Sequence, residues 1–141
     1  MLYTLDFGTL TEGSGTQTSD LEVLNSLLDA LYQDTLSGIF DTTGVSSFSL
    51  TGVGAFSGIG LGSSRTGIQV SLDTSMGAGF YDETLILYAS SVNASGSSAL
   101  SDVQLRVTGT IEDPPAVPEP GTFVLLALGG AALLARRRKM N

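Results

Sequence analysis

The side chains of this chain that could do chemistry are carboxylates and hydroxyls, because its 141 residues include no histidine and no cysteine. Those absences remove the usual general base, the usual zinc ligands, the thiol nucleophile and the serine triads. Asp82 and Glu83 are adjacent carboxylates, but neighbours on an extended strand point to opposite faces and do not make a catalytic pair. The sequence therefore predicts no catalytic residues and no enzyme activity.

Metal and nucleotide sites have only weak signals in the sequence. Calcium would need carboxylates from separate loops, such as Asp73, Asp82 and Asp102, because no EF-hand loop pattern is present. Solvated acidic turns are the simpler interpretation, so we predict no metal and no cofactor. The glycines within residues 52–62 lack the G-x-G-x-x-G spacing and precede no P-loop lysine. We expect them to form flexible connections between Phe48 and Ile68.

Aromatic side chains offer a further chemistry, stacking on sugar rings. Tyr32, Tyr81 and Tyr88 are the candidates, although the absence of tryptophan weakens this interpretation. Tyrosine rings pack in cores with their hydroxyls at the edge, and we expect that arrangement for Tyr88, which lies in an apolar strand. Self-association through an exposed sheet edge is another alternative in a chain so poor in lysine.

The last quarter of the sequence is its most specific feature. Pro118-Glu119-Pro120 can continue neither a helix nor a sheet ladder, because its prolines fix φ and remove two donors. An uncharged run from Phe123 to Ala135 follows, and in lipid such a run satisfies its backbone only as a helix. Four basic residues close the segment: Arg136, Arg137, Arg138 and Lys139. Because basic residues stay on the cytoplasmic side, everything before Pro118 would lie outside.

The distribution of charge agrees with this interpretation. The chain has fourteen acidic residues, all at or before Glu119, and only Arg65 and Arg106 oppose them there. The body therefore carries −12 and the tail +4, which together give the net charge of −8. An acidic body repels phosphate backbones, so we expect no nucleic acid partner.

The segment from Val117 to Thr122, the apolar run and the basic cluster resemble a PEP-CTERM sorting domain, found in exported proteins of Gram-negative bacteria that make exopolysaccharide. The resemblance implies that a membrane-embedded cysteine transpeptidase, the exosortase, recognises Pro118, Glu119 and Pro120 and cleaves near them. It implies that the basic cluster is a stop signal and that the body reaches the cell surface or beyond. Exopolysaccharide, in a biofilm setting, is a candidate partner.

The apolar run is short for a permanent membrane span. Thirteen residues at about 1.5 Å each reach roughly 20 Å, whereas the hydrocarbon core is about 30 Å thick. This length favours a transient processing signal over a permanent anchor, which remains the alternative.

The chain divides into three parts in this interpretation. Residues 1–112 form one domain, residues 113–121 a proline-rich linker, and residues 122–141 a hydrophobic helix with a basic tail. An exported protein needs an N-terminal signal, yet Met1 to Phe7 include no basic residue and no long apolar stretch. We therefore expect further residues upstream of Met1.

Apolar residues at every second position predict an all-β body. The clearest strand runs from Val103 to Ile111. A second, Ile68 to Leu72, is followed by the turn-prone Met76 to Gly79 and then by Thr84 to Tyr88, and we expect a hairpin. Shorter candidates bring the total to six to eight strands: Tyr3 to Phe7, Leu21 to Val23, and Phe48 to Leu50.

One segment, Leu21 to Gln33, fits either class. Its leucines at positions 24, 27, 28 and 31 have helical spacing, and Asp20 would be the N-cap. Five motifs favour strands instead, and in this order they resemble the repeat of choice-of-anchor domains: Leu5–Thr9, Leu21–Asn25, Val70–Ser75, Gly77–Tyr81 and Leu105–Ile111. That resemblance implies a single Ig-like antiparallel β-sandwich, related in pattern to the ASPM, SPD-2 and Hydin module, with no catalytic residues. It also implies a stalk or surface role.

Overall fold

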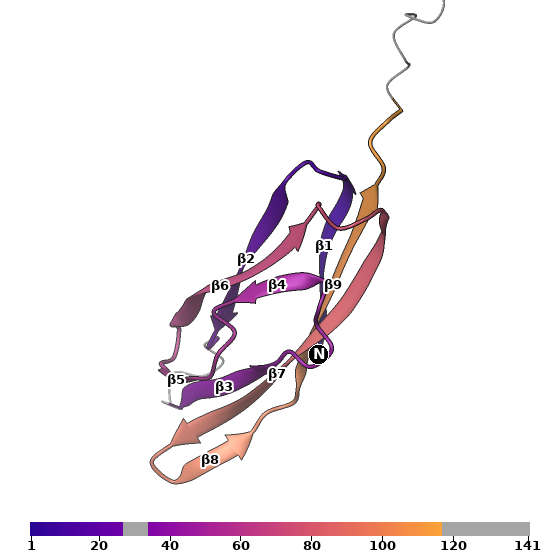
Figure 1. The fold of residues 1–141 in the computed structure, drawn as a ribbon. Coiled ribbons are helices and arrows are strands. Elements are labelled where there is room, and N and C mark those ends of the chain that lie inside the picture. The colour runs from indigo at the N-terminus through magenta and orange to yellow at the C-terminus, as the bar shows by residue number, and fades with distance from the viewer. Residues whose placement is uncertain (27–33, 117–141) are drawn as a thin grey trace, which may run out of the picture.

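The computed structural model describes residues 1–26 and 34–116, which form nine strands and no helix (Figure 1). The prediction of an all-β body is confirmed, with more strands than the six to eight expected. The strands are β1 (Leu2–Thr11), β2 (Thr16–Leu24), β3 (Thr35–Asp41), β4 (Phe48–Thr51), β5 (Phe56–Ile59), β6 (Ser64–Asp73), β7 (Gly79–Asn93), β8 (Gly96–Ala99) and β9 (Val103–Glu112).

The strands form two sheets that face each other (Figure 1). The larger sheet has the order β1-β9-β7-β3-β5, with β8 paired to the far end of β7; the smaller sheet has the order β2-β6-β4. Every pair is antiparallel except β1 with β9. The expectation of a wholly antiparallel sandwich is therefore wrong at this one pair. Parallel neighbours need a long crossover connection, and here the other seven strands supply it.

The core lies between the sheets and follows the predicted alternation. Ile68, Val70 and Leu72 of β6 are each 0% exposed, and Val107 and Ile111 of β9 are equally enclosed. Their neighbours Gln69, Ser71 and Arg106 are at least partly solvent-accessible. β6 thus has one buried face, as period two requires, while in β9 Thr108 and Gly109 are buried as well.

The predicted hairpin between β6 and β7 is wrong, because the two strands belong to different sheets. The chain crosses from one sheet to the other after Asp73, and Val70 and Leu72 then pack against Leu85 across the core. Both strands have buried apolar residues on one face, and stacking the strands face to face buries these residues against each other.

Two further segments test the sequence predictions. At the ambiguous segment, Leu21 to Leu24 lie in β2, paired with β6, so the strand prediction is confirmed for these residues and the helical alternative is wrong there; residues 27–33 lie outside the described part. The glycine-rich segment is not wholly a flexible connection, because Phe56–Ile59 forms β5 beside β3. Phe56 and Ile59 are buried in a second core cluster with Leu36 and Leu87, which explains why this segment is held as a strand.

Candidate functional site

The described chain ends where the predicted sorting segment begins. After β9 ends at Glu112, Asp113–Ala116 have no secondary structure and lead away from one end of the sandwich (Figure 1). The predicted motif at positions 118–120, the apolar run 123–135, the basic cluster 136–139 and Tyr32 all lie outside the described residues. Among the residues that the structure does describe, no helix is long and apolar enough to span a membrane.

We call the end from which the tail leaves the tail pole; it comprises the turn at residues 12–15, the loop at residues 73–78, and Glu112. Backbone hydrogen bonds join these parts: Glu12 N–H donates to Glu112 O at 2.8 Å, and Gly13 N–H donates to Thr74 O at 2.8 Å. The Thr74 hydroxyl accepts from Gly15 N–H and donates to Gly15 O, both at 2.8 Å. Thr74 is 0% exposed, so the tail leaves from a fixed point.

Replacing Thr74 with valine is expected to lower the free energy of unfolding by about 1–3 kcal/mol. The substitution keeps the side-chain shape but leaves the Gly15 N–H and C=O without their buried partner. Chemical denaturation followed by tyrosine fluorescence measures the change. Thr74→Ser is the control, because it keeps the hydroxyl; a valine variant as stable as the serine variant would contradict the assigned hydrogen bonds.

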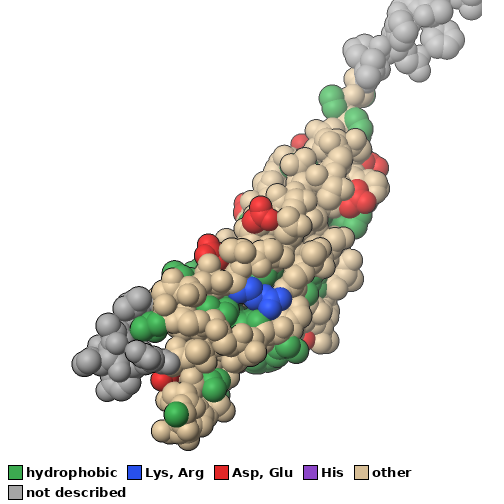
Figure 2. All heavy atoms as spheres, turned by 90° about the vertical axis from the view of Figure 1, so that its left-hand side faces the viewer, with side chains coloured by type: hydrophobic (Ala, Val, Ile, Leu, Met, Phe, Trp, Pro, Cys, Tyr) green, Lys and Arg blue, Asp and Glu red, His purple; other side chains and the backbone are tan. Residues whose placement is uncertain are grey.

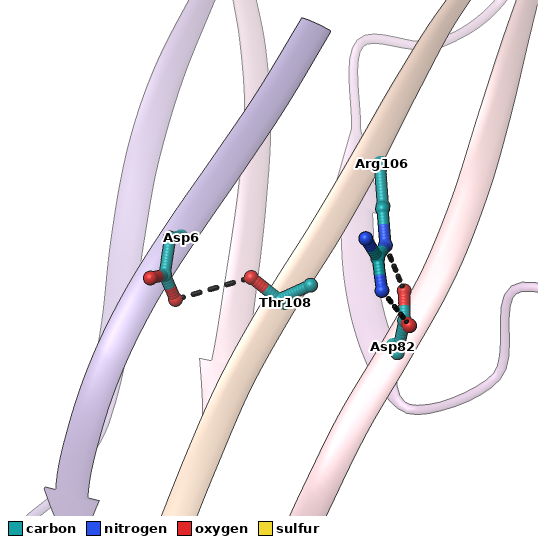
Figure 3. Close-up of polar contacts among 4 residues, drawn as sticks. All are labelled: Asp6, Asp82, Arg106 and Thr108. Atoms are coloured by element: carbon teal, nitrogen blue, oxygen red, sulfur yellow. Dashed lines mark hydrogen bonds and ion pairs between the residues drawn. The ribbon is translucent and has the colours of Figure 1, made fainter.

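The outer face of the six-stranded sheet holds a polar row across three strands (Figure 3). The Arg106 guanidinium of β9 donates to both carboxylate oxygens of Asp82 on β7, with Nε at 2.8 Å. In the same row, the Thr108 hydroxyl donates to Asp6 of β1 at 3.1 Å. The Arg106 hydrogen bond lowers the pKa of Asp82. Because this ion pair is solvent-exposed, it adds little to the free energy of unfolding. Its main effect is to link the neighbouring strands β9 and β7.

Glu83 points the opposite way from Asp82, as predicted for neighbours on a strand. Its carboxylate accepts from the backbone N–H groups of Ser46 and Ser47 at 3.0–3.2 Å, and from the Ser46 hydroxyl at 3.1 Å. Burial raises the pKa of Glu83, but the hydrogen bonds from Ser47 and Ser46 together outweigh it and lower the pKa. Glu83 thus fastens the β3–β4 loop to β7, a structural role.

This role predicts a pH dependence. A carboxyl group whose folded pKa lies below its unfolded value stabilises the fold above that unfolded value, near 4.5, and the stabilisation is lost as pH falls through the folded pKa. The difference in Tm between the wild type and Glu83→Gln is therefore expected to be largest near neutral pH and to shrink below pH 4.5. Thermal unfolding at a series of pH values measures it, and a difference independent of pH would contradict the prediction.

The tyrosines occupy different environments. Tyr81 faces inward, and its hydroxyl donates to Gly77 O at 2.5 Å. Tyr88 is 43% exposed on the outer face, directly opposite Ile39, which is 50% exposed. The expectation that Tyr88 packs in the core is therefore wrong. In β7 the buried positions are Leu85 and Leu87, and strand alternation places Tyr88 on the other face.

Two of the three carboxylates considered for calcium, those of Asp73 and Asp82, serve as local structural partners, whereas Asp102 contacts the N-terminus through its backbone carbonyl. Asp73 accepts from Ser75 N–H at 2.9 Å, and Asp82 is paired with Arg106. Within residues 1–26 and 34–116, no three acidic side chains lie close enough together to hold a metal ion.

A small polar hollow of about 210 Å³, which sequence reasoning missed, lies at the β7–β8 hairpin. In it, Asp34 accepts hydrogen bonds from Ser91 and Asn93. The hydrogen bond from Ser91, followed by that from Asn93, lowers the pKa of Asp34. These contacts join the start of β3 to the hairpin, and the sequence gives no spacing signal for them.

Figure 2 shows the face of the molecule around β2 and β6. Most acidic side chains visible there lie towards the tail pole, whereas basic atoms lie nearer the other end beside hydrophobic side chains (Figure 2). Arg65 of β6 donates to Gly52 O at 2.7 Å and lies 5.2 Å from the centre of the Phe56 ring. Arg65 and Arg106 thus both have partners within the fold.

Comparison with known proteins places the sorting signal where the sequence predicted it. The family model of the PEP-CTERM protein-sorting motif matches residues 116–139, which include the proline-flanked glutamate, the apolar run and the basic cluster. The match supports an exported protein that is associated with a membrane during sorting. No curated protein sequence matches the chain significantly.

Solved structures support the fold of the body. The ASH/PapD-like domain of human CEP192 is similar with a TM-score of 0.55 and 13% identity, covering 79% of this chain and 82% of that domain. The VesB protease of Vibrio cholerae is similar with a TM-score of 0.53 and 18% identity, covering 76% of this chain but only 30% of that protein. At such low identities the similarities establish a PapD-like, Ig-like sandwich and nothing about activity.

Proposed function

We propose that this chain is an exported, non-enzymatic surface or matrix protein that an exosortase cleaves and sorts through residues 116–139. The sorting-motif match carries the proposal. The acidic residues agree with it, because the side chains of Asp82, Glu83 and Asp34 are engaged in structural hydrogen bonds. The resemblance to choice-of-anchor domains adds a stalk or surface role, and the resemblance to PEP-CTERM proteins adds an exopolysaccharide and biofilm setting in a Gram-negative cell.

Cell fractionation tests this function. The chain, preceded by a cleavable export signal, is expressed in a Gram-negative host with and without an exosortase. With the enzyme, we expect the body to leave the inner-membrane fraction and to become sensitive to protease added outside the cell. A body that stays in the inner membrane in both hosts would show a permanent anchor instead.

A second function, binding of a neutral saccharide, is favoured by the position of Tyr88. Its ring and Ile39 form an exposed apolar surface on the outer face of the sheet. The strand pairing places Thr84 and Gln104 on the same face as Tyr88, where their side chains are potential hydrogen-bonding groups. Thr84 lies opposite Arg106, and Gln104 lies opposite Ile86. Asp41 and Asp82 lie on this face too and would repel an anionic polymer.

Affinity electrophoresis in gels containing a neutral polysaccharide tests the second function. Removing a stacking ring by Tyr88→Ala is expected to weaken retardation about two- to tenfold. Tyr3→Ala is the matched control, because Tyr3 is a 54% exposed tyrosine on the edge strand. Equal retardation of both variants and the wild type would reject saccharide binding at Tyr88.

A further inference from the structure

We propose that Asp113–Ala116, through Pro114 and Pro115, position the sorting motif by holding it clear of the body during cleavage. The inference rests on the proposed function, since it concerns the same cleavage. Successive prolines fix φ and favour the extended polyproline II conformation, at about 3.1 Å per residue. In that conformation the four residues from Asp113 to Ala116 span about 12 Å beyond Glu112.

The base of this spacer is fixed. Glu112 ends β9, its carbonyl accepts from Glu12 N–H, and the adjoining turn is tied to the buried Thr74. A spacer rooted in a mobile end would let the body swing across the motif. Here backbone hydrogen bonds and the buried Thr74 tie the parts of the tail pole together, so the length and stiffness of residues 113–116 decide how far the body stands from the motif.

The negative charge of the tail pole gives a second reason for the length of the spacer. Asp73, Glu112 and Asp113 are exposed around the tail pole, and Glu12 is half-buried beside them. A membrane-embedded enzyme draws the motif towards the lipid surface, and anionic lipid headgroups would repel these carboxylates. At physiological ionic strength charges are screened over about 8 Å. A spacer of about 12 Å exceeds that length, so the acidic pole does not oppose the approach of the motif.

The test is the rate of exosortase-dependent cleavage in cells, followed by pulse-chase labelling. Deleting residues 113–115 is expected to slow cleavage at least about tenfold, a barrier increase of about 1.4 kcal/mol. Replacing them with Gly-Ser-Gly restores the length and is expected to restore most of the rate, with a loss of a few fold because the chain is more flexible. Cleavage of the deletion variant at the wild-type rate would overturn the proposal.

Two further measurements separate the possible causes. The Tm of each body should equal that of the wild type, since residues 113–115 are exposed and belong to no strand; a lowered Tm in the deletion variant would overturn the positioning role. Asp73→Asn with Glu112→Gln, added to the deletion, is expected to recover part of the rate, and no recovery would overturn the charge argument. Absence of cleavage in the wild type itself would refute the proposed function, a separate result.

Discussion

Replacing Gly52 with alanine is expected to lower the free energy of unfolding by roughly 2–5 kcal/mol. Gly52 has a φ of +73°, which costs a residue with a Cβ about 1–2 kcal/mol. A Cβ there would also lie 2.1 Å from the carbonyl oxygen of Gly67, a backbone atom that cannot rotate away. Relieving that overlap must shift β4 against β6, at a cost of about 1–3 kcal/mol.

Two other glycines separate these causes. Gly44 has a φ of +85°, and no atom lies within 4 Å of the position that an added methyl group would take, so Gly44→Ala reports the cost of the conformation alone. Gly54 has neither a positive φ nor a close neighbour, so Gly54→Ala should change stability by about 0.5 kcal/mol or less. Urea denaturation of the three variants measures the series. A loss in Gly52→Ala no greater than in Gly44→Ala would contradict the close approach to Gly67.

Replacing Pro118, Glu119 and Pro120 together with alanine is expected to reduce exosortase-dependent cleavage at least about tenfold. The substitution removes the two prolines, which fix φ, and the charged group by which an enzyme could recognise the segment, while the apolar run and the basic cluster remain. Immunoblotting of the cleaved fraction in the enzyme-containing host measures the effect.

Asp102→Ala is the matched control for that variant. It also removes a carboxylate, but from the body, where only the backbone carbonyl of Asp102 contacts the N-terminus. Its cleavage should equal that of the wild type. Equal cleavage of the triple-alanine variant would show that the enzyme does not read the proline-flanked glutamate.

The strands whose buried face could be predicted are those in which one face alone is apolar. Val103 to Ile111 and Ile68 to Leu72 alternate cleanly, and both proved to be strands with the expected faces buried. Pairing could not be predicted in the same way, because β6 and β7 have the same pattern whether they lie side by side or face each other. β5 could not be predicted because its four residues include a glycine and lie between glycine-rich turns.

Of the candidate functional site, only the sorting signal could be predicted from the sequence. The sorting signal is a continuous segment, so its order of proline, apolar run and basic cluster is visible without a fold. The position of Tyr88 could not be predicted, because the run from Thr84 to Tyr88 is apolar at successive positions and the face that points inward is set by the pairing with β3 and β9. Thr74 and Glu83 act through backbone groups distant in sequence, for which residue spacing carries no signal.

Intact mass spectrometry of the exported protein tests the central claim most directly. The chain, carrying an export signal, is purified from hosts with and without an exosortase. We expect the mass to fall by everything beyond the Pro118–Pro120 region only when the enzyme is present. An unchanged mass in both hosts, with the protein retained in the inner membrane, would contradict the account and identify the tail as a permanent anchor.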